Sequence, residues 1–196
     1  NKAKAITSVS MFYDLENPND FVHELSDILD DNGIWIVQMN YLVKMLENNA
    51  FDNIVHEHLE YYSLQSLEFL LNKHDMDVFN IEFNNINGGS IRAYVKHKNC
   101  KKFSITNTVQ KTREHEKNLG LDHEKPYFDF ADRIEKLKKQ TFDFIKTEVN
   151  NGNIIHVYGA STRGNTLLQY YGLDSILIKA ASDRNPSKWG KRTAGT

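Results

Sequence analysis

The sequence lacks a cysteine pair that could form a disulfide, and it lacks a long apolar run that could cross a membrane. Its 196 residues include one cysteine, Cys100, and three prolines. A single cysteine cannot form a disulfide within the chain, which fits a reducing cytoplasm. No apolar run approaches the roughly 20 residues that a membrane-spanning helix needs, and no positively charged start leads into a signal-like apolar segment. We therefore expect a cytoplasmic protein with no membrane partner.

An excess of charge of one sign is also missing. Lysine and arginine number 24 and aspartate and glutamate 26, so the net charge is -2. Such a balance gives no broad attraction to nucleic acid or to an anionic membrane, and any site for a polyanion must be local. Hydrophobic residues make up 40% of the chain, which is enough for the core of one large domain or two small ones. The oligomeric state does not follow from these numbers.

Both ends of the sequence lie close to apolar or structured segments. The chain begins without methionine, almost directly in the apolar run 5–9, and stops at 192–196 before the last expected element is complete. We expect a fragment of a longer protein.

The first hundred residues predict alternating strands and helices. The run 5–9 is followed by a helix that starts near Pro18, with Asn19 or Asp20 as its cap, and ends at Asn32 and Gly33. A buried strand over 34–39 then completes a βαβ unit. Helices are expected over 41–49 and 63–74, and strands over 76–83 and 91–97 form a hairpin whose turn holds a glycine pair suited to positive φ. This order matches, as an analogy of fold, the C-terminal half of a class I methyltransferase (Rossmann-like) sheet.

A second, partial Rossmann-like α/β unit is expected at the end of the chain. The stretch 100–126 is polar and only weakly periodic, so we place a boundary there. A long helix follows, and residues 150–152 end it. Then come a strand over 154–158, a turn over 159–165, a helix to about 171 and a strand over 176–182. The fold class is therefore α/β, with predicted domains 1–100, 101–150 and 151–196. The expected apolar stripe of the long helix consists of Phe130, Ile134, Leu137, Thr141, Phe144 and Ile145.

The segment 51–64 is the most informative part of the chain. It places two imidazoles and two carboxylates beside two phenols: His56, His58, Glu57, Glu60, Tyr61 and Tyr62. Such clusters shift the pKa values of their members and are typical of proton-transfer sites. Two alternatives remain. In a strand, His56 and His58 would share a face and could ligate a metal, although the zinc spacing i, i+4 is absent because position 60 is Glu60. The histidines could also be hydrogen-bonded polar groups at a domain edge.

A second motif, 159–166, follows an expected strand and opens a helix. Its backbone N–H groups, two hydroxyls and Arg163 suit a phosphate or pyrophosphate. Asn165 stands where a Walker loop has its lysine, and the second glycine of the dinucleotide fingerprint is missing. The alternative is a strand-to-helix turn that merely needs Gly159.

Asp183 lies where Rossmann folds place a ribose-binding carboxylate, and the residues after it carry a local excess of positive charge: Arg184, Lys188, Lys191 and Arg192.

The segments 51–64, 87–92, 159–168 and 183–190 together closely resemble the S-adenosylmethionine-dependent C-methyltransferases of nucleotide-linked deoxysugars, in the order of that family and over nearly the whole chain. The resemblance implies the end of a methyltransferase domain followed by the start of a C-terminal Rossmann-like domain. It places the glycine-rich cofactor loop and a zinc-binding domain upstream of Asn1, with no metal in this chain.

The resemblance also implies roles for individual residues. His58 would be the base, Glu57 would position it or the sugar, and His56 would belong to the same catalytic group. Val55 stands where the best-known sugar enzymes have a tyrosine, which puts the acceptor in doubt. Residues expected near S-adenosylmethionine are Phe12, Tyr13 and Asp14. Residues expected to bind the substrate are Tyr61, Tyr62, Arg92, Gly159, Ser161, Arg163, Gly164 and Asn165.

The expected function is therefore methyl transfer to a carbon next to the keto group of a nucleotide-linked sugar, through an enolate formed with the help of a histidine. A sugar-nucleotide oxidoreductase and a non-enzymatic nucleotide-sugar-binding module are the alternatives. We expect no turnover from these 196 residues alone, because half of the cofactor site would lie upstream.

Overall fold

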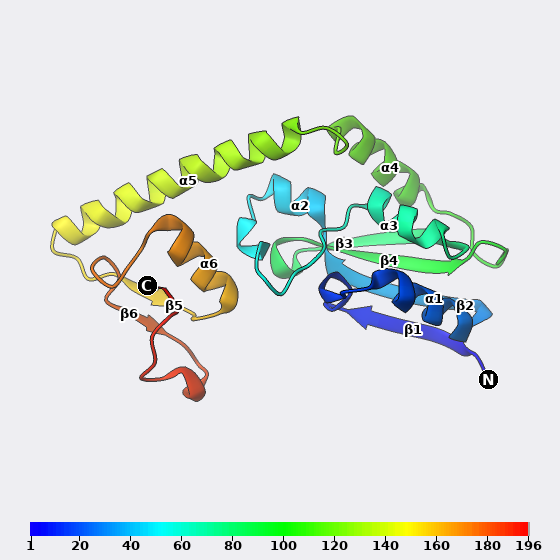
Figure 1. Ribbon diagram of the computed structural model, residues 1–196. Helices are drawn as coiled ribbons and strands as arrows, with labels where there is room; N and C mark the ends of the chain where they lie inside the picture. The colour runs from blue at the N-terminus through cyan, green and yellow to red at the C-terminus, as the bar shows by residue number, and fades with distance from the viewer. Residues whose placement is uncertain (196) are drawn as a thin grey trace. The chain divides into compact units, whose positions relative to one another are not determined.

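Two units, each compact by itself, make up the computed structural model, which describes residues 1–195 (Figure 1). Unit 1 consists of Asn1–Ala50 and His56–Tyr127. Unit 2 consists of Phe51–Val55 and the chain from Phe128 onward. The short segment Phe51–Val55 thus packs with unit 2, although both of its neighbours in sequence belong to unit 1. The predicted domain boundaries stay predictions.

Unit 1 is built on a four-stranded sheet in the order β1-β2-β4-β3. The strands are β1 (Ala3–Val9), β2 (Leu29–Asn40), β3 (Met76–Asn84) and β4 (Ser90–His97). β1 and β2 are parallel, and β4 runs antiparallel to both of its neighbours. The predicted βαβ unit and hairpin are therefore confirmed, as is the α/β class with an antiparallel strand inserted at the end.

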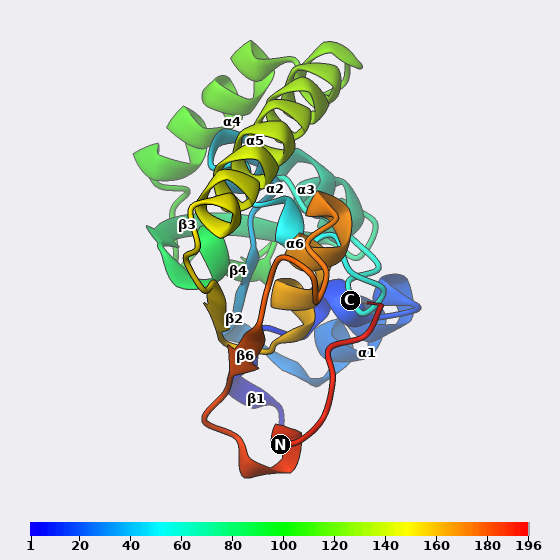
Figure 2. The same ribbon diagram turned by 90° about the vertical axis from the view of Figure 1, so that its left-hand side faces the viewer.

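The predicted helices of unit 1 are present, with corrections to the cap and the end of α1 and with one additional helix, α4. They are η1 (Phe12–Asp14), α1 (Pro18–Ile28), α2 (Leu42–Glu47), α3 (Leu64–Asn72), η3 (Ile86–Gly88) and α4 (Asn107–Leu119). The cap of α1 is Asn17, not Asn19 or Asp20, because Pro18 occupies the first turn and the side chain of Asn17 accepts from the Asp20 N–H. The helix α4, which lies beside α3, was not predicted from the sequence (Figures 1 and 2).

Gly33 does not end a helix, as the sequence predicted, but lies inside β2. A Cβ atom at this position would stand 2.8 Å from the Ala3 carbonyl oxygen and 3.0 Å from that of Asp30. Only glycine allows the two backbones to approach so closely at the start of the β1–β2 pair. β2 therefore begins at Leu29, five residues before the predicted strand.

Aromatic side chains fill the centre of the unit 1 core. Phe12 is fully buried, and its ring centroid lies 5.3 Å from that of Trp35 and 5.2 Å from that of Tyr62. The indole Nε1–H of Trp35 donates to the Ser8 hydroxyl at 3.0 Å, so its one polar atom has a partner. The core therefore joins the end of β1, the middle of β2 and the loop before α3.

The β3–β4 turn has the backbone conformation that its glycines predicted. Asn87, Gly88 and Gly89 have φ values of 55°, 86° and 128°. A Cβ on Gly89 would also stand 2.5 Å from the Cβ of Lys44 in α2. Both the positive φ and the lack of space therefore require glycine at this position.

Unit 2 contains most of a long helix and one small α/β motif. Its elements are η2 (Phe51–Asn53), α5 (Lys125–Asn150, from Phe128 onward), β5 (His156–Tyr158), α6 (Thr162–Tyr171), β6 (Ala180–Ser182) and η4 (Pro186–Lys188). β5 and β6 are parallel and α6 connects them, which confirms the predicted unit, although both strands are shorter than expected. Phe144 is 64% exposed, so it does not belong to the buried stripe of α5, whereas Phe142 and Ile145 pack on the small core. Within residues 1–195, no helix is both long and apolar enough to cross a membrane.

The close approach at Gly33 gives a stability test. We expect Gly33→Ala to lower the free energy of unfolding by about 1–3 kcal/mol, the usual cost of forcing atoms into a packed site. Urea denaturation measures the change. Asp31→Ala, at an exposed position two residues earlier, is the control and should change stability by less than about 0.5 kcal/mol. An equal effect of the two substitutions would contradict the account.

Candidate functional site

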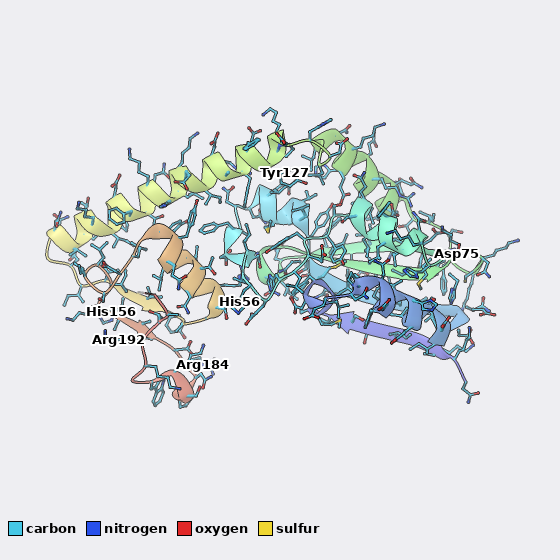
Figure 3. The ribbon with its side chains drawn as sticks, in the orientation of Figure 1. His56, Asp75, Tyr127, His156, Arg184 and Arg192 are labelled. Atoms are coloured by element: carbon cyan, nitrogen blue, oxygen red, sulfur yellow. The ribbon has the colours of Figure 1, made fainter. Side chains whose placement is uncertain are left out.

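The histidine triplet lies in an irregular loop of unit 1 that leads to α3 (Figure 3, where His56 is labelled). His56 and Glu57 are in a turn and exposed, while His58 is half-buried. The segment is not a strand, so the shared-face geometry that would have favoured a metal site does not apply. Among residues 1–195, no group of three His, Cys, Asp or Glu side chains could hold a metal ion.

The loop is attached to the turn that follows β1. The carbonyl oxygen of Tyr13 accepts hydrogen bonds from the N–H groups of Leu59 and Glu60, at 3.0 and 3.1 Å. The imidazole of His58 stands on edge against the Tyr13 ring, with centroids 4.6 Å apart and planes at 68°. Unit 1 thus brings the predicted base together with the predicted cofactor turn.

Asp14 is the exposed member of this turn, whereas Phe12 and Tyr13 are buried. Desolvation raises the pKa of the Asp14 carboxyl and the negative charge of Glu57 adds to this, while His58 opposes it. The turn follows the carboxyl end of β1, next to the parallel strand β2, and this edge of an open α/β sheet is where ligands usually bind. A carboxylate here suits a positively charged ligand.

The two phenols after the triplet have different surroundings. Tyr62 is buried against Phe12, and its carbonyl oxygen accepts from the Leu42 N–H at 3.0 Å. Burial, with help from the charge of Glu60, raises the Tyr62 pKa. Tyr61 is half-buried. Tyr61 is therefore the more accessible of the two, and Tyr62 fixes the loop to the core.

Arg92 lies within the sheet rather than in the histidine loop. From β4 its guanidinium donates to the Gln38 side-chain oxygen at 2.8 and 3.0 Å and to Glu82 at 3.1 Å. These neighbouring-strand contacts stabilise the pairing of β2, β4 and β3. The predicted role of Arg92 in substrate binding stays a prediction.

The glycine-rich segment of unit 2 is a shorter turn than predicted, because α6 already begins at Thr162. Gly159 has φ +103°, and Ser161 caps the helix by accepting from the Gly164 N–H at 3.0 Å. Gly164 and Asn165 therefore belong to the first turn of α6, not to the loop. The buried Oδ1 of Asn165 has no hydrogen-bond partner within the described chain.

Arg163 already has an anionic partner in unit 2. Its Nε donates to the Asp52 carboxylate at 2.7 Å and its Nη2 lies 2.5 Å from the same oxygen. Phe51, next to Asp52, packs against Tyr170 and Tyr171 of α6. This cluster attaches the segment Phe51–Val55 to α6, a role that the sequence did not indicate.

Asp183 organises the loop after β6. One carboxylate oxygen accepts from the Ala160 N–H at 2.8 Å and from Lys188 at 3.1 Å, and the other accepts from the Asn185 N–H at 2.8 Å. These donors lower the pKa of Asp183 to about 2. Both oxygens thus support the protein's own backbone, whereas the sequence suggested that they bind a ribose.

An open pocket of about 640 Å³ lies beside this loop in unit 2. Asn165 and Asp183 line it, together with basic residues and one tryptophan: Lys179, Lys188, Lys191, Arg192 and Trp189. Figure 3 labels Arg192 and Arg184 in this part of the chain. The tail of positive charge was visible in the sequence. The contribution of Lys179 was not, because it depends on how the segment before β6 folds.

The low pKa of Asp183 gives a pH-dependent prediction. A carboxyl whose pKa is lower in the folded state contributes stability that is full above its ordinary pKa of 3.8 and is lost as the pH falls toward 2. We therefore expect the difference in Tm between the wild type and Asp183→Asn to be largest above pH 4 and to shrink toward pH 2.5. Tryptophan fluorescence can follow it, because the Trp189 Nε1–H donates to the Asp183 carbonyl oxygen at 2.8 Å.

Asp132→Asn, at an exposed position on α5, is the matched control and should give no such pH-dependent difference. A constant difference between wild type and Asp183→Asn at all pH values would contradict the role assigned to this carboxylate.

Comparison with known proteins gives one family match and one curated relative. Residues 85–196 match the model of the family described as the C-methyltransferase C-terminal domain. Over 194 residues the chain is 30% identical to the C-methyltransferase NovU of Streptomyces niveus, in an alignment that covers 99% of this chain and 46% of NovU. The chain therefore spans about half the length of the curated relative that it matches.

Solved structures are more distant. A complex of LepI with SAM aligns with a TM-score of 0.42 and 10% identity, and a LepI variant in complex with SAH and a substrate analogue aligns with a TM-score of 0.42 and 9% identity. Each alignment covers 49% of this chain and 26% of the other.

Proposed function

Since this chain belongs to the family of C-methyltransferase C-terminal domains, we propose that it is part of an enzyme that moves a methyl group from S-adenosylmethionine to a carbon next to the keto group of a nucleotide-linked deoxysugar. The observation that supports this most is the placement of His58 against Tyr13, at the carboxyl edge of the β1–β2 pair. A proton acceptor and the edge at which α/β sheets bind ligands lie together there.

His58 acts as the general base. A hydrogen on the carbon next to a ketone is acidic enough for an imidazole to remove. The proton passes to the imidazole while the electron pair moves toward the carbonyl oxygen, which gives an enolate. His58 is half-buried and backed by the Tyr13 ring, so its orientation is restricted before the substrate arrives.

Asp14 is the residue that would face the methyl donor. S-adenosylmethionine supplies an electrophilic methyl group on a positively charged sulfur. The exposed carboxylate of Asp14 fits a cation of this kind, and it lies on the same turn as the ring that backs His58. Phe12 and Tyr13 are buried, so they would shape this site through the backbone and the core.

The pocket of unit 2, taken by itself, has the chemistry to bind a nucleotide diphosphate. A diphosphate requires positive charge, which Lys179, Lys191 and Arg192 offer, and an exposed indole such as Trp189 can stack on a base. Arg163 is less suited to bind the phosphates, because Asp52 already neutralises it.

The test uses the whole enzyme of which this chain is part, with S-adenosylmethionine and a panel of nucleotide-linked keto sugars. The masses of the products are measured by mass spectrometry. We expect a product heavier by one methyl group. We expect His58→Asn to lower kcat by at least about 100-fold, the usual contribution of a general base.

His23→Asn, which changes an exposed histidine on α1, is the control and should leave the rate unchanged. A methylated product formed equally well by His58→Asn would exclude His58 as the base. Absence of any heavier product from the wild type would contradict the proposed reaction.

A further inference from the structure

Glu116 of α4 is a buried carboxylate in unit 1 that none of the steps above uses. Its side chain is 2% exposed. One oxygen accepts from the Tyr41 hydroxyl at 2.7 Å and from the Leu64 N–H at 2.6 Å, and the other accepts from the Gln65 N–H at 2.9 Å. Both oxygens are therefore hydrogen-bonded.

These contacts explain why a carboxylate can be buried there. A buried charge is costly unless hydrogen bonds replace the lost water. Leu64 and Gln65 are the first two residues of α3, and their N–H groups have no acceptor within the helix. A negative charge at this helix end is also favoured by the helix dipole. Glu116 thus fixes the start of α3, because its two oxygens accept from the N–H groups of Leu64 and Gln65.

The start of α3 is also the end of the histidine loop. Leu64 follows His58 by six residues. Between them, the Tyr62 carbonyl oxygen accepts from the Leu42 N–H, and Ser63 caps α3 through a reciprocal pair of hydrogen bonds with Ser66. The chain after His58 is therefore held over several consecutive residues.

The Glu116 carboxylate also fixes the residue that precedes α2, Tyr41. Tyr41, which donates its hydroxyl to Glu116, precedes α2, and its backbone N–H donates to the Gly89 carbonyl oxygen of the β3–β4 turn at 3.2 Å. Leu42, the next residue, is the one that binds Tyr62. Glu116 of α4 therefore joins the residue before α2 to the start of α3, at the end of the loop.

We propose that Glu116 is a positioning residue for His58. It acts through the start of α3, which fixes one end of the histidine loop, while the Tyr13 carbonyl oxygen fixes the loop next to His58 itself. Loss of the Glu116 contacts lets the loop slide along Tyr13 and moves the imidazole away from the substrate carbon. The proposal rests on the proposed function for its effect on turnover, but its effect on the loop does not depend on any substrate.

The test compares Glu116→Gln with Glu114→Gln, which makes the same chemical change at an exposed position of the same helix. Glutamine keeps one acceptor oxygen for the Tyr41 hydroxyl and the Leu64 N–H. Its amide NH₂ then faces the Gln65 N–H, and because both groups are donors, that hydrogen bond is lost. Hydrogen exchange of individual amides is measured in the intact protein, below the Tm of both variants. We expect exchange at Leu59 and Glu60 to be at least about tenfold faster in Glu116→Gln, with exchange at Val37 and Val95 of the sheet unchanged.

Turnover gives the second readout. We expect kcat of Glu116→Gln to fall about tenfold with the KM for the methyl donor unchanged, because a base displaced by a fraction of an ångström loses rate rather than binding. Tyr41→Phe removes a single donor and should act in the same direction to a smaller extent, which keeps the test usable if Glu116→Gln does not fold.

Exchange at Leu59 and Glu60 that is no faster than in Glu114→Gln overturns the positioning role, whatever the activity. Faster exchange with an unchanged kcat overturns its importance for the reaction. Faster exchange at these amides in a protein that methylates no keto sugar supports the positioning role and contradicts the proposed function instead.

Discussion

The two hydrogen bonds that the Tyr13 carbonyl oxygen accepts from Leu59 and Glu60 are the contacts on which the rest of the candidate site depends. They join the turn after β1 to a loop with no regular structure of its own. A loop of this kind is held only by contacts such as these, because it lacks the hydrogen-bond ladder of a helix or a strand. The proposed chemistry needs His58 beside the edge of the sheet, and this carbonyl oxygen is what keeps it there.

Carboxylates that bind backbone N–H groups fix the loops in both units. Glu116 accepts from the first two N–H groups of α3 in unit 1, and Asp183 accepts from Ala160 and Asn185 in unit 2. In each case the anion replaces water at donors that regular structure leaves unsatisfied. Such carboxylates specify one geometry, since a displaced loop would leave a charge without partners. The acidic residues that organise the protein are therefore distinct from Asp14, which is exposed and suited to a ligand.

The sequence predicted those elements whose signals are local. Alternation of apolar residues and the glycine pair at Gly88 and Gly89 predicted the β3–β4 hairpin, because these features act within a few residues. The helix α4 was missed because its buried positions include Thr112 and Glu116, which a search for apolar periodicity does not recognise. The partners of Ser161 and Arg163 could not be predicted either. Ser161 caps a helix that starts earlier than expected, and Asp52, which binds Arg163, lies 111 residues away in the sequence.

The most direct test of the central claim is deuterium incorporation into the acceptor without a methyl donor. The intact protein is incubated in D₂O with a nucleotide-linked keto sugar, and mass spectrometry locates the deuterium. If His58, held by the loop on Tyr13, removes the hydrogen next to the ketone, the wild type should place deuterium on that carbon and His58→Asn should not. Incorporation at equal rates in the two proteins would contradict the account, because the proton would then leave without the imidazole.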